Sequence, residues 1–144
     1  MFVAIQKIKT GVDLPEKDSE GNIINITPEY RELKAFLAST KEELENNEFI
    51  QYERIEEYPF AEMYNGVIYV SKDELVEAKK SHVRSIRDSY LVQYVDSVVS
   101  NPLRWADMKD EEKKVYTDYR RYLLDYTTQE NWYESNPLTL EDWK

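Results

Sequence analysis

The sequence predicts an α+β protein, with a small β-containing module over residues 1–70 and a helical part over residues 71–144. Short β-branched runs separated by turn residues fill the first half, whereas apolar residues recur at helical spacing in the second. Only 3 glycines and 5 prolines interrupt the 144 residues, so long regular elements are expected.

The first half opens with a predicted strand over residues 2–8, a turn at residues 18–22 and a second β-branched run at residues 23–26. Thr27 and Pro28 then have the order of a helix cap and a first helical residue, so a helix is expected to follow. Its apolar residues stand three and four positions apart: Tyr30, Leu33, Phe36 and Leu37.

Two more local signals follow in the first half. Thr40 and Glu43 have the spacing of a capping box, which predicts a short helical turn. A strand-like pair at residues 49–50 comes next, and Asn65-Gly66 predicts a two-residue hairpin turn before the apolar run at residues 67–70.

The second half predicts a helical hairpin. Residues 71–74 form a capping box, and a helical stripe of apolar residues continues to Val98. Asn101-Pro102 should end this helix, and a second helix is expected from Lys109 to Tyr126. Two such helices should pack antiparallel, with the aromatic tail at residues 131–144 folded back over them.

Composition narrows the possible partners. The chain has 19 Lys and Arg against 29 Asp and Glu, a net charge of −10, which argues against binding a phosphate backbone or an anionic membrane. An aromatic share of 13% argues against disorder. The chain has no cysteine, no signal-peptide pattern and no apolar run of about 20 residues. We therefore expect an intracellular protein, without a nucleic-acid or membrane partner, that binds another protein.

Few residues point to catalysis or metal binding. The single histidine, His82, lies in a basic helical stretch without a nucleophile motif, and the glycines are too scattered for a phosphate loop. Residues 16–21 have the acidic spacing of a calcium loop, but Thr27 stands where a bidentate glutamate is needed. We expect no catalytic residue, metal or cofactor.

Tyrosines on the second helix allow two interpretations. They could form a core with their hydroxyls at its rim, or a protein-binding face, because Tyr, Trp and Arg are enriched at interface hot spots. Arg120 and Arg121 beside them favour the second interpretation. The predicted partner-binding residues are Tyr119, Arg120, Tyr122, Tyr126, Trp132 and Trp143.

Two spaced motifs in the helical part carry a family resemblance. The first is Arg87-Asp88-Ser89-Tyr90-Leu91, followed by Asp96. After a connection with Trp105 comes Tyr119-Arg120-Arg121-Tyr122-Leu123-Leu124-Asp125-Tyr126-Thr127, and Pro137 and Trp143 close the pattern. Over residues 87–144 the chain resembles the phage tail assembly chaperone family, small proteins linked to tail-fibre assembly.

The resemblance implies a non-enzymatic chaperone in the host cytoplasm, without a cofactor, that binds and solubilises a tail or tail-fibre protein. The first 70 residues could then determine specificity. The motif residues expected to have structural roles are Arg87, Asp88, Leu91, Asp96, Leu123 and Asp125. Among them, Arg87 and Asp88 would pair the two helices through ion pairs.

Two alternatives remain open from the sequence. The chain could be a structural virion component, such as a tail, connector or fibre-tip subunit. It could also be an acidic inhibitor that mimics DNA, although its acidic residues are interspersed with 19 basic ones.

Overall fold

The computed structural model describes residues 1–48 and 51–144, so the predicted strand-like pair at residues 49–50 lies outside the described residues. The chain divides into two compact units, Met1–Leu75 (unit 1) and Val76–Lys144 (unit 2). Unit 1 carries an antiparallel β-sheet and unit 2 is helical, which confirms the α+β class.

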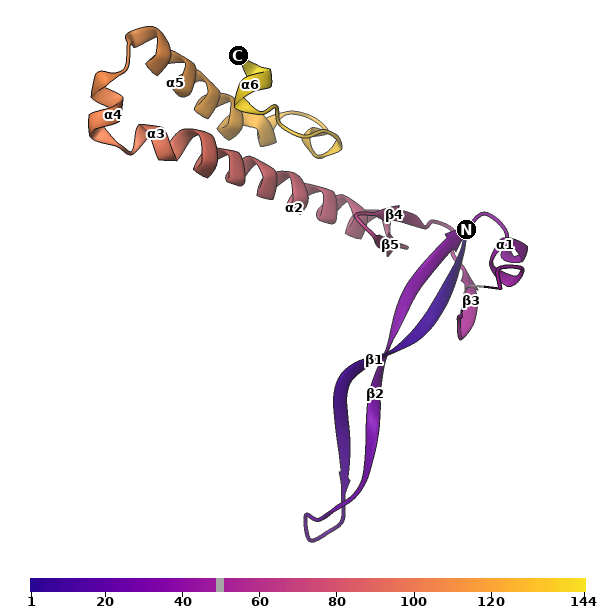
Figure 1. Ribbon diagram of the computed structural model, residues 1–144. Helices are drawn as coiled ribbons and strands as arrows, with labels where there is room; N and C mark the ends of the chain where they lie inside the picture. Colours follow the sequence, from indigo (N-terminus) through magenta and orange to yellow (C-terminus); the bar gives the residue numbers. More distant parts are fainter. Residues whose placement is uncertain (49–50) are drawn as a thin grey trace. The chain divides into compact units, whose positions relative to one another are not determined.

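Unit 1 is built on a three-stranded antiparallel sheet in the order β2-β1-β3. Its strands are β1 (Phe2–Lys17), β2 (Ile23–Ala38) and β3 (Arg54–Glu57). The predicted turn between β1 and β2 is confirmed, because an Asp18 carboxylate oxygen accepts the backbone N–H groups of Glu20 and Asn22 at 2.9 Å. β1 and β2 together form a long twisted ribbon (Figure 1).

The helix predicted after Pro28 is wrong, because residues 23–38 form one continuous strand. Arg31 and Leu33 lie opposite Ile8 and Gln6 of β1. This pairing provides backbone partners along the strand, whereas the 3- and 4-residue spacing of four apolar residues is a weak local preference. Pro28 lies beside a register shift in β1, where a strand tolerates proline.

Two further local predictions for unit 1, the capped helical turn and the second hairpin, are confirmed. Thr40 caps α1 (Lys41–Glu45) by accepting the Glu43 N–H at 3.4 Å. Asn65 and Gly66 join β4 (Glu62–Tyr64) to β5 (Val67–Tyr69), with φ angles of 48° and 77°. Both residues thus have the positive φ that a type I′ hairpin turn requires.

The core of unit 1 lies at the beginning of β1, on both faces of the sheet. Val3 and Ile5 pack with Ala61 and Ile68 on one face. Ala4, on the opposite face, packs with Ala38 and Leu44. Successive side chains of β1 thus alternate between two covered faces of the sheet. The ribbon contributes to these clusters only at this end, through Phe2–Ile5 of β1 and Phe36–Ala38 of β2.

Unit 2 contains the predicted helical hairpin, with differences in detail. The first helical run comprises α2 (Lys72–Tyr90), which begins in unit 1, the π-helical segment η1 (Leu91–Asp96) and α3 (Ser97–Val99). A short helix that was not predicted, α4 (Pro102–Asp107), occupies the connection to α5 (Asp110–Asp125). The chain then passes through the single turns η2 (Tyr126–Thr128), η3 (Trp132–Glu134) and α6 (Leu140–Trp143).

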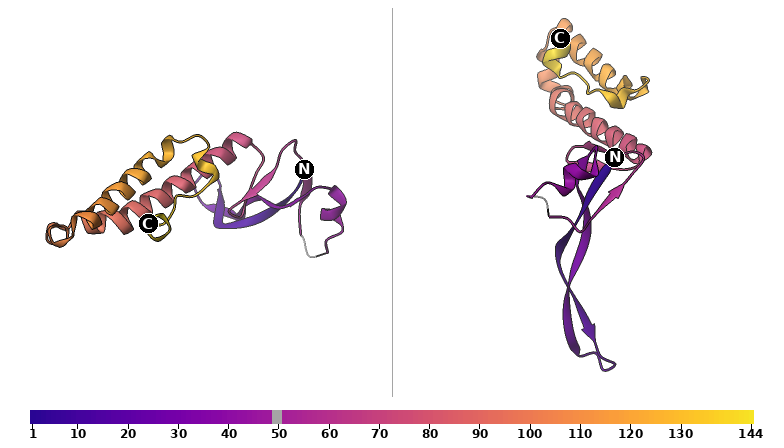
Figure 2. Two further views of the ribbon diagram at one scale, coloured as in Figure 1. Left: turned by 90° about the horizontal axis from the view of Figure 1, so that it is seen from above. Right: turned by 90° about the vertical axis from the view of Figure 1, so that its right-hand side faces the viewer.

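The core of unit 2 joins the helical hairpin to the C-terminal tail. Val95, Tyr119, Leu123 and Leu140 form the buried cluster, with Trp143 packed against it. The tail therefore folds back over the helices, as predicted, and the right-hand view of Figure 2 shows it beside α5.

Candidate functional site

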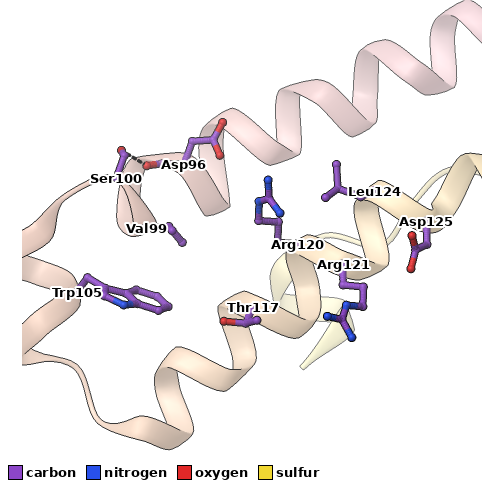
Figure 3. A pocket seen from close by; sticks show the side chains of 9 residues that line it. All are labelled: Asp96, Val99, Ser100, Trp105, Thr117, Arg120, Arg121, Leu124 and Asp125. Atoms are coloured by element: carbon purple, nitrogen blue, oxygen red, sulfur yellow. Dashed lines mark hydrogen bonds between the residues drawn. The ribbon is translucent and has the colours of Figure 1, made fainter.

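The candidate site is an open groove in unit 2, between the end of the first helical run, α4 and α5 (Figure 3). Its volume is about 630 Å³. Nine residues line it: Asp96, Val99, Ser100, Trp105, Thr117, Arg120, Arg121, Leu124 and Asp125. We refer to it as the hairpin groove.

Local sequence signals place the walls of the hairpin groove. Asp96 is the last residue of the π-helical segment, a type of irregularity that occurs frequently at functional sites. The Asn101 side chain accepts the Arg104 N–H at 3.1 Å, and Pro102 occupies the first turn of α4. These two residues start α4 and so bring Trp105 to the groove.

The groove presents charges of both signs. Arg120 and Arg121 of α5 and the acidic residues Asp96 and Asp125 are all exposed. Within residues 1–48 and 51–144, the side chains of these four residues form no ion pair. Figure 3 shows Arg120 reaching from α5 towards the first helical run. Such charges are available to a partner without breaking an existing ion pair.

Apolar surface lies between these charges. Val99 is 37% exposed and Leu124 is 42% exposed. Trp105 is half-buried, with the Lys113 ammonium 5.9 Å from the centre of its ring. A concave surface with apolar patches and unpaired charges of both signs fits a polypeptide segment better than a small acidic or basic ligand.

Two of the six predicted partner-binding residues belong to the core instead. Tyr119 is 0% exposed and Tyr126 is 5% exposed, so neither side chain can contact a partner in this conformation. The prediction was wrong for these two residues because residues spaced three and four apart share one face of a helix. In α5 that face packs against the first helical run and the tail, and so it is buried.

The other four predicted residues are at least partly accessible. Arg120 is exposed and lines the groove, whereas Tyr122, Trp132 and Trp143 are half-buried. The Trp143 ring lies 6.1 Å from that of Tyr122, and the Arg84 guanidinium lies 5.1 Å from the centre of the Trp132 ring. The structure therefore does not gather the six residues on one surface.

The two sequence motifs, residues 87–96 and 119–127, meet across the helical hairpin. Arg87, from the first motif, donates to the Thr127 hydroxyl at the end of the second motif, at 3.2 Å. Its ion pair with Asp88, at 2.7 Å, stays within α2, so the prediction that Arg87 and Asp88 form ion pairs between the helices is wrong. A hydrogen bond makes the link instead.

The remaining motif residues divide between core and groove. Leu123 is fully buried and Leu91 packs against the same cluster. Asp96 and Asp125 line the hairpin groove, which gives them positions at a surface rather than in the packing between the helices.

Tyrosine hydroxyls attach the C-terminal tail to α5 and η2. Tyr119 donates to the Leu138 carbonyl at 2.9 Å, and the Tyr122 hydroxyl accepts the Leu138 N–H at 2.9 Å. Tyr126 and Ser135 share a hydrogen bond of 2.7 Å between their hydroxyls. Burial raises the pKa of Tyr119 far above its ordinary value, so the phenol keeps the proton that it donates.

Sequence reasoning did not single out Val99, Trp105 and Leu124 as site residues. Val99 and Leu124 follow the core residues Val98 and Leu123 along the chain, and so lie beside the buried stripe rather than on it. Their position just outside a helical stripe of apolar residues was the only signal that the sequence offered. Trp105 could not be placed without α4.

Comparisons with protein-family models, with curated proteins and with solved structures found no match to this chain. Among residues 1–48 and 51–144, no helix has both the length and the apolar character required to cross a bilayer. The same residues contain no group of three or more His, Asp or Glu side chains that could hold a metal ion.

Proposed function

We propose that this protein is a non-enzymatic assembly chaperone that binds a phage tail or tail-fibre protein and keeps it in solution until it assembles. The observation that carries the proposal is the meeting of the two family motifs. They are linked by the Arg87–Thr127 hydrogen bond, and they contribute Asp96, Arg120 and Asp125 to one groove.

The groove suits an unassembled client. Before assembly, such polypeptides expose unpaired strand edges and apolar patches that promote aggregation. Val99, Trp105 and Leu124 offer apolar contact, and the charges of Arg120 and Arg121 can pair with acidic groups of the client. The net charge of −10 favours a complex that stays dissolved.

The contact surface that we propose is therefore centred on the hairpin groove. Arg120 is kept from the sequence-based prediction, and Arg121, Leu124 and Trp105 are added. Tyr122, Trp132 and Trp143, which are half-buried, extend the proposed surface towards the tail. The host cytoplasm, where tails assemble, is the proposed location.

Co-expression tests the proposal. The full chain should be produced together with the tail or tail-fibre protein encoded beside it, with an unrelated acidic protein of similar size as the control. We expect a higher soluble yield of the tail protein and a complex that co-purifies. The absence of both a gain in yield and a complex would refute the chaperone function. Stoichiometric amounts of this chain in purified particles would instead identify a virion component.

A further inference from the structure

Among residues 1–48 and 51–144, the ribbon of unit 1 has a long strand edge that pairs with no other strand. β3 pairs only with Phe2–Ile5 of β1, and β2 is the edge strand of the sheet. We call residues 6–34, beyond that pairing, the hairpin arm (Figure 1). Seven of its large apolar side chains are between 42% and 62% exposed: Val12, Leu14, Ile23, Ile24, Ile26, Tyr30 and Leu33.

An arm of this kind is not expected to remain alone in water. A two-stranded hairpin without a third strand or a covered face is marginally stable. Its free edge is also a template for pairing with another strand, which proteins normally block with charges, prolines or short edges. In β2 the apolar run at residues 23–26 has no such block, and Pro28 is the only proline.

We propose that the hairpin arm pairs with the same arm of a second copy of this chain, β2 against β2, antiparallel about a two-fold axis at Tyr30. In this register Glu29 lies opposite Arg31 of the second copy, and symmetry repeats the pair on the other side of the axis. Tyr30 lies opposite Tyr30 of the second copy. Opposite charges and aromatic side chains are favourable cross-strand pairs.

The charges of the chain favour a second copy as the partner at this edge. Arg31 is exposed and has no ion-pair partner among the described residues, and Glu29 interacts only with the Thr10 hydroxyl, at 2.7 Å. The arm carries five basic and six acidic residues, a net charge of −1 out of −10 for the chain. Two copies that meet at their arms therefore experience little electrostatic repulsion. Two-fold pairing is also the commonest symmetry of oligomers.

This inference does not depend on the proposed chaperone function, and the purified protein alone can test it. The mass of the full chain should be measured by sedimentation equilibrium over a range of concentrations at about 0.15 M salt. We expect a dimer of twice the 17.2 kDa chain mass. Hydrogen exchange should show slower exchange of the β2 amides at concentrations where the dimer forms.

A charge-swap series identifies the interface. Arg31→Glu places like charges opposite each other twice, and we expect it to weaken dimerisation about tenfold or more. The double variant Glu29→Arg with Arg31→Glu restores both pairs and should return to within about threefold of the wild-type dissociation constant. Arg104→Glu makes the same charge change in unit 2, at an exposed position outside the lining of the hairpin groove, and should leave dimerisation unchanged.

Each other outcome overturns the proposal. A chain that stays monomeric with its strand circular dichroism intact would show that the arm does not pair with itself. Protection of β2 only when a tail protein is added would assign the edge to that protein. A dimer that is insensitive to Arg31→Glu, or that Arg104→Glu disrupts, would place the interface elsewhere.

Discussion

At the scale of single residues, tyrosines in unit 2 both fill the core and attach the C-terminal tail through hydrogen bonds. Tyr119 and Tyr126 are buried, yet each hydroxyl finds a partner in the tail. Buried polar groups that keep a hydrogen bond avoid the desolvation cost of an unpaired one. The many tyrosines of α5 are thus explained in part by the attachment of the tail.

Tyr119 should make the stability of unit 2 sensitive to alkaline pH. Because its pKa in the folded protein lies above the value of about 10 in the unfolded chain, its contribution to stability is full below about pH 10 and is lost as the pH rises further. Denaturant unfolding at pH 7 to 11 should show a steeper loss for the wild type than for Tyr119→Phe. Tyr116→Phe is the control, and equal slopes for Tyr119→Phe and wild type would contradict the assignment.

The contact between Arg87 and Thr127 should be measurable as a coupling. A double-mutant cycle with Arg87→Ala and Thr127→Val should give an interaction free energy of about 0.5–1.5 kcal/mol in thermal or denaturant unfolding. Additive effects of the two substitutions would show that the motifs are not linked through this hydrogen bond.

At the scale of elements, local signals succeeded where a few neighbouring residues decide the structure. The caps at Thr40 and Ser71 and the turn at Asn65-Gly66 were readable because each depends on short-range hydrogen bonds or backbone angles. The strand over residues 23–38 was missed in its second half because its pairing with β1 joins distant residues. The π-helical segment has no local sequence signal that we can name.

The turn between β4 and β5 should depend on glycine. Gly66→Ala forces a side chain into φ +77° with no steric clash nearby, so we expect a loss of about 1 kcal/mol from backbone strain alone. Asn65→Gly, at the neighbouring positive φ, should change stability by less than about 0.5 kcal/mol. Equal losses for the two variants in denaturant unfolding would argue against this turn.

The docking of the tail should depend on one of its two neighbouring leucines. Leu140 is 7% exposed and belongs to the core cluster, whereas Leu138 is 47% exposed. We expect Leu140→Ala to lower the free energy of unfolding by about 2–4 kcal/mol and Leu138→Ala by less than about 1 kcal/mol. The opposite order in calorimetry would show that the tail packs differently.

At the scale of the whole molecule, the sequence predicted the class of fold better than it predicted the proposed contact surface. The helical hairpin and the folded-back tail followed from periodicity and caps. The groove did not, since it needs α4, Trp105 and the position of Arg120 relative to the first helical run. Side-chain exposure separates core from contact surface, and periodicity alone does not reveal it.

The central claim is that the hairpin groove holds the client, and a matched pair of variants tests it most directly. Arg120→Glu with Leu124→Asp changes the groove, and Arg104→Glu with Leu103→Asp makes the same changes at exposed positions of α4 outside the groove lining. Each should be co-expressed with the tail or tail-fibre protein, after thermal unfolding confirms an unchanged fold. We predict at least about a tenfold loss of co-purified client for the groove variant only. Equal recovery of the client by both variants would contradict the claim.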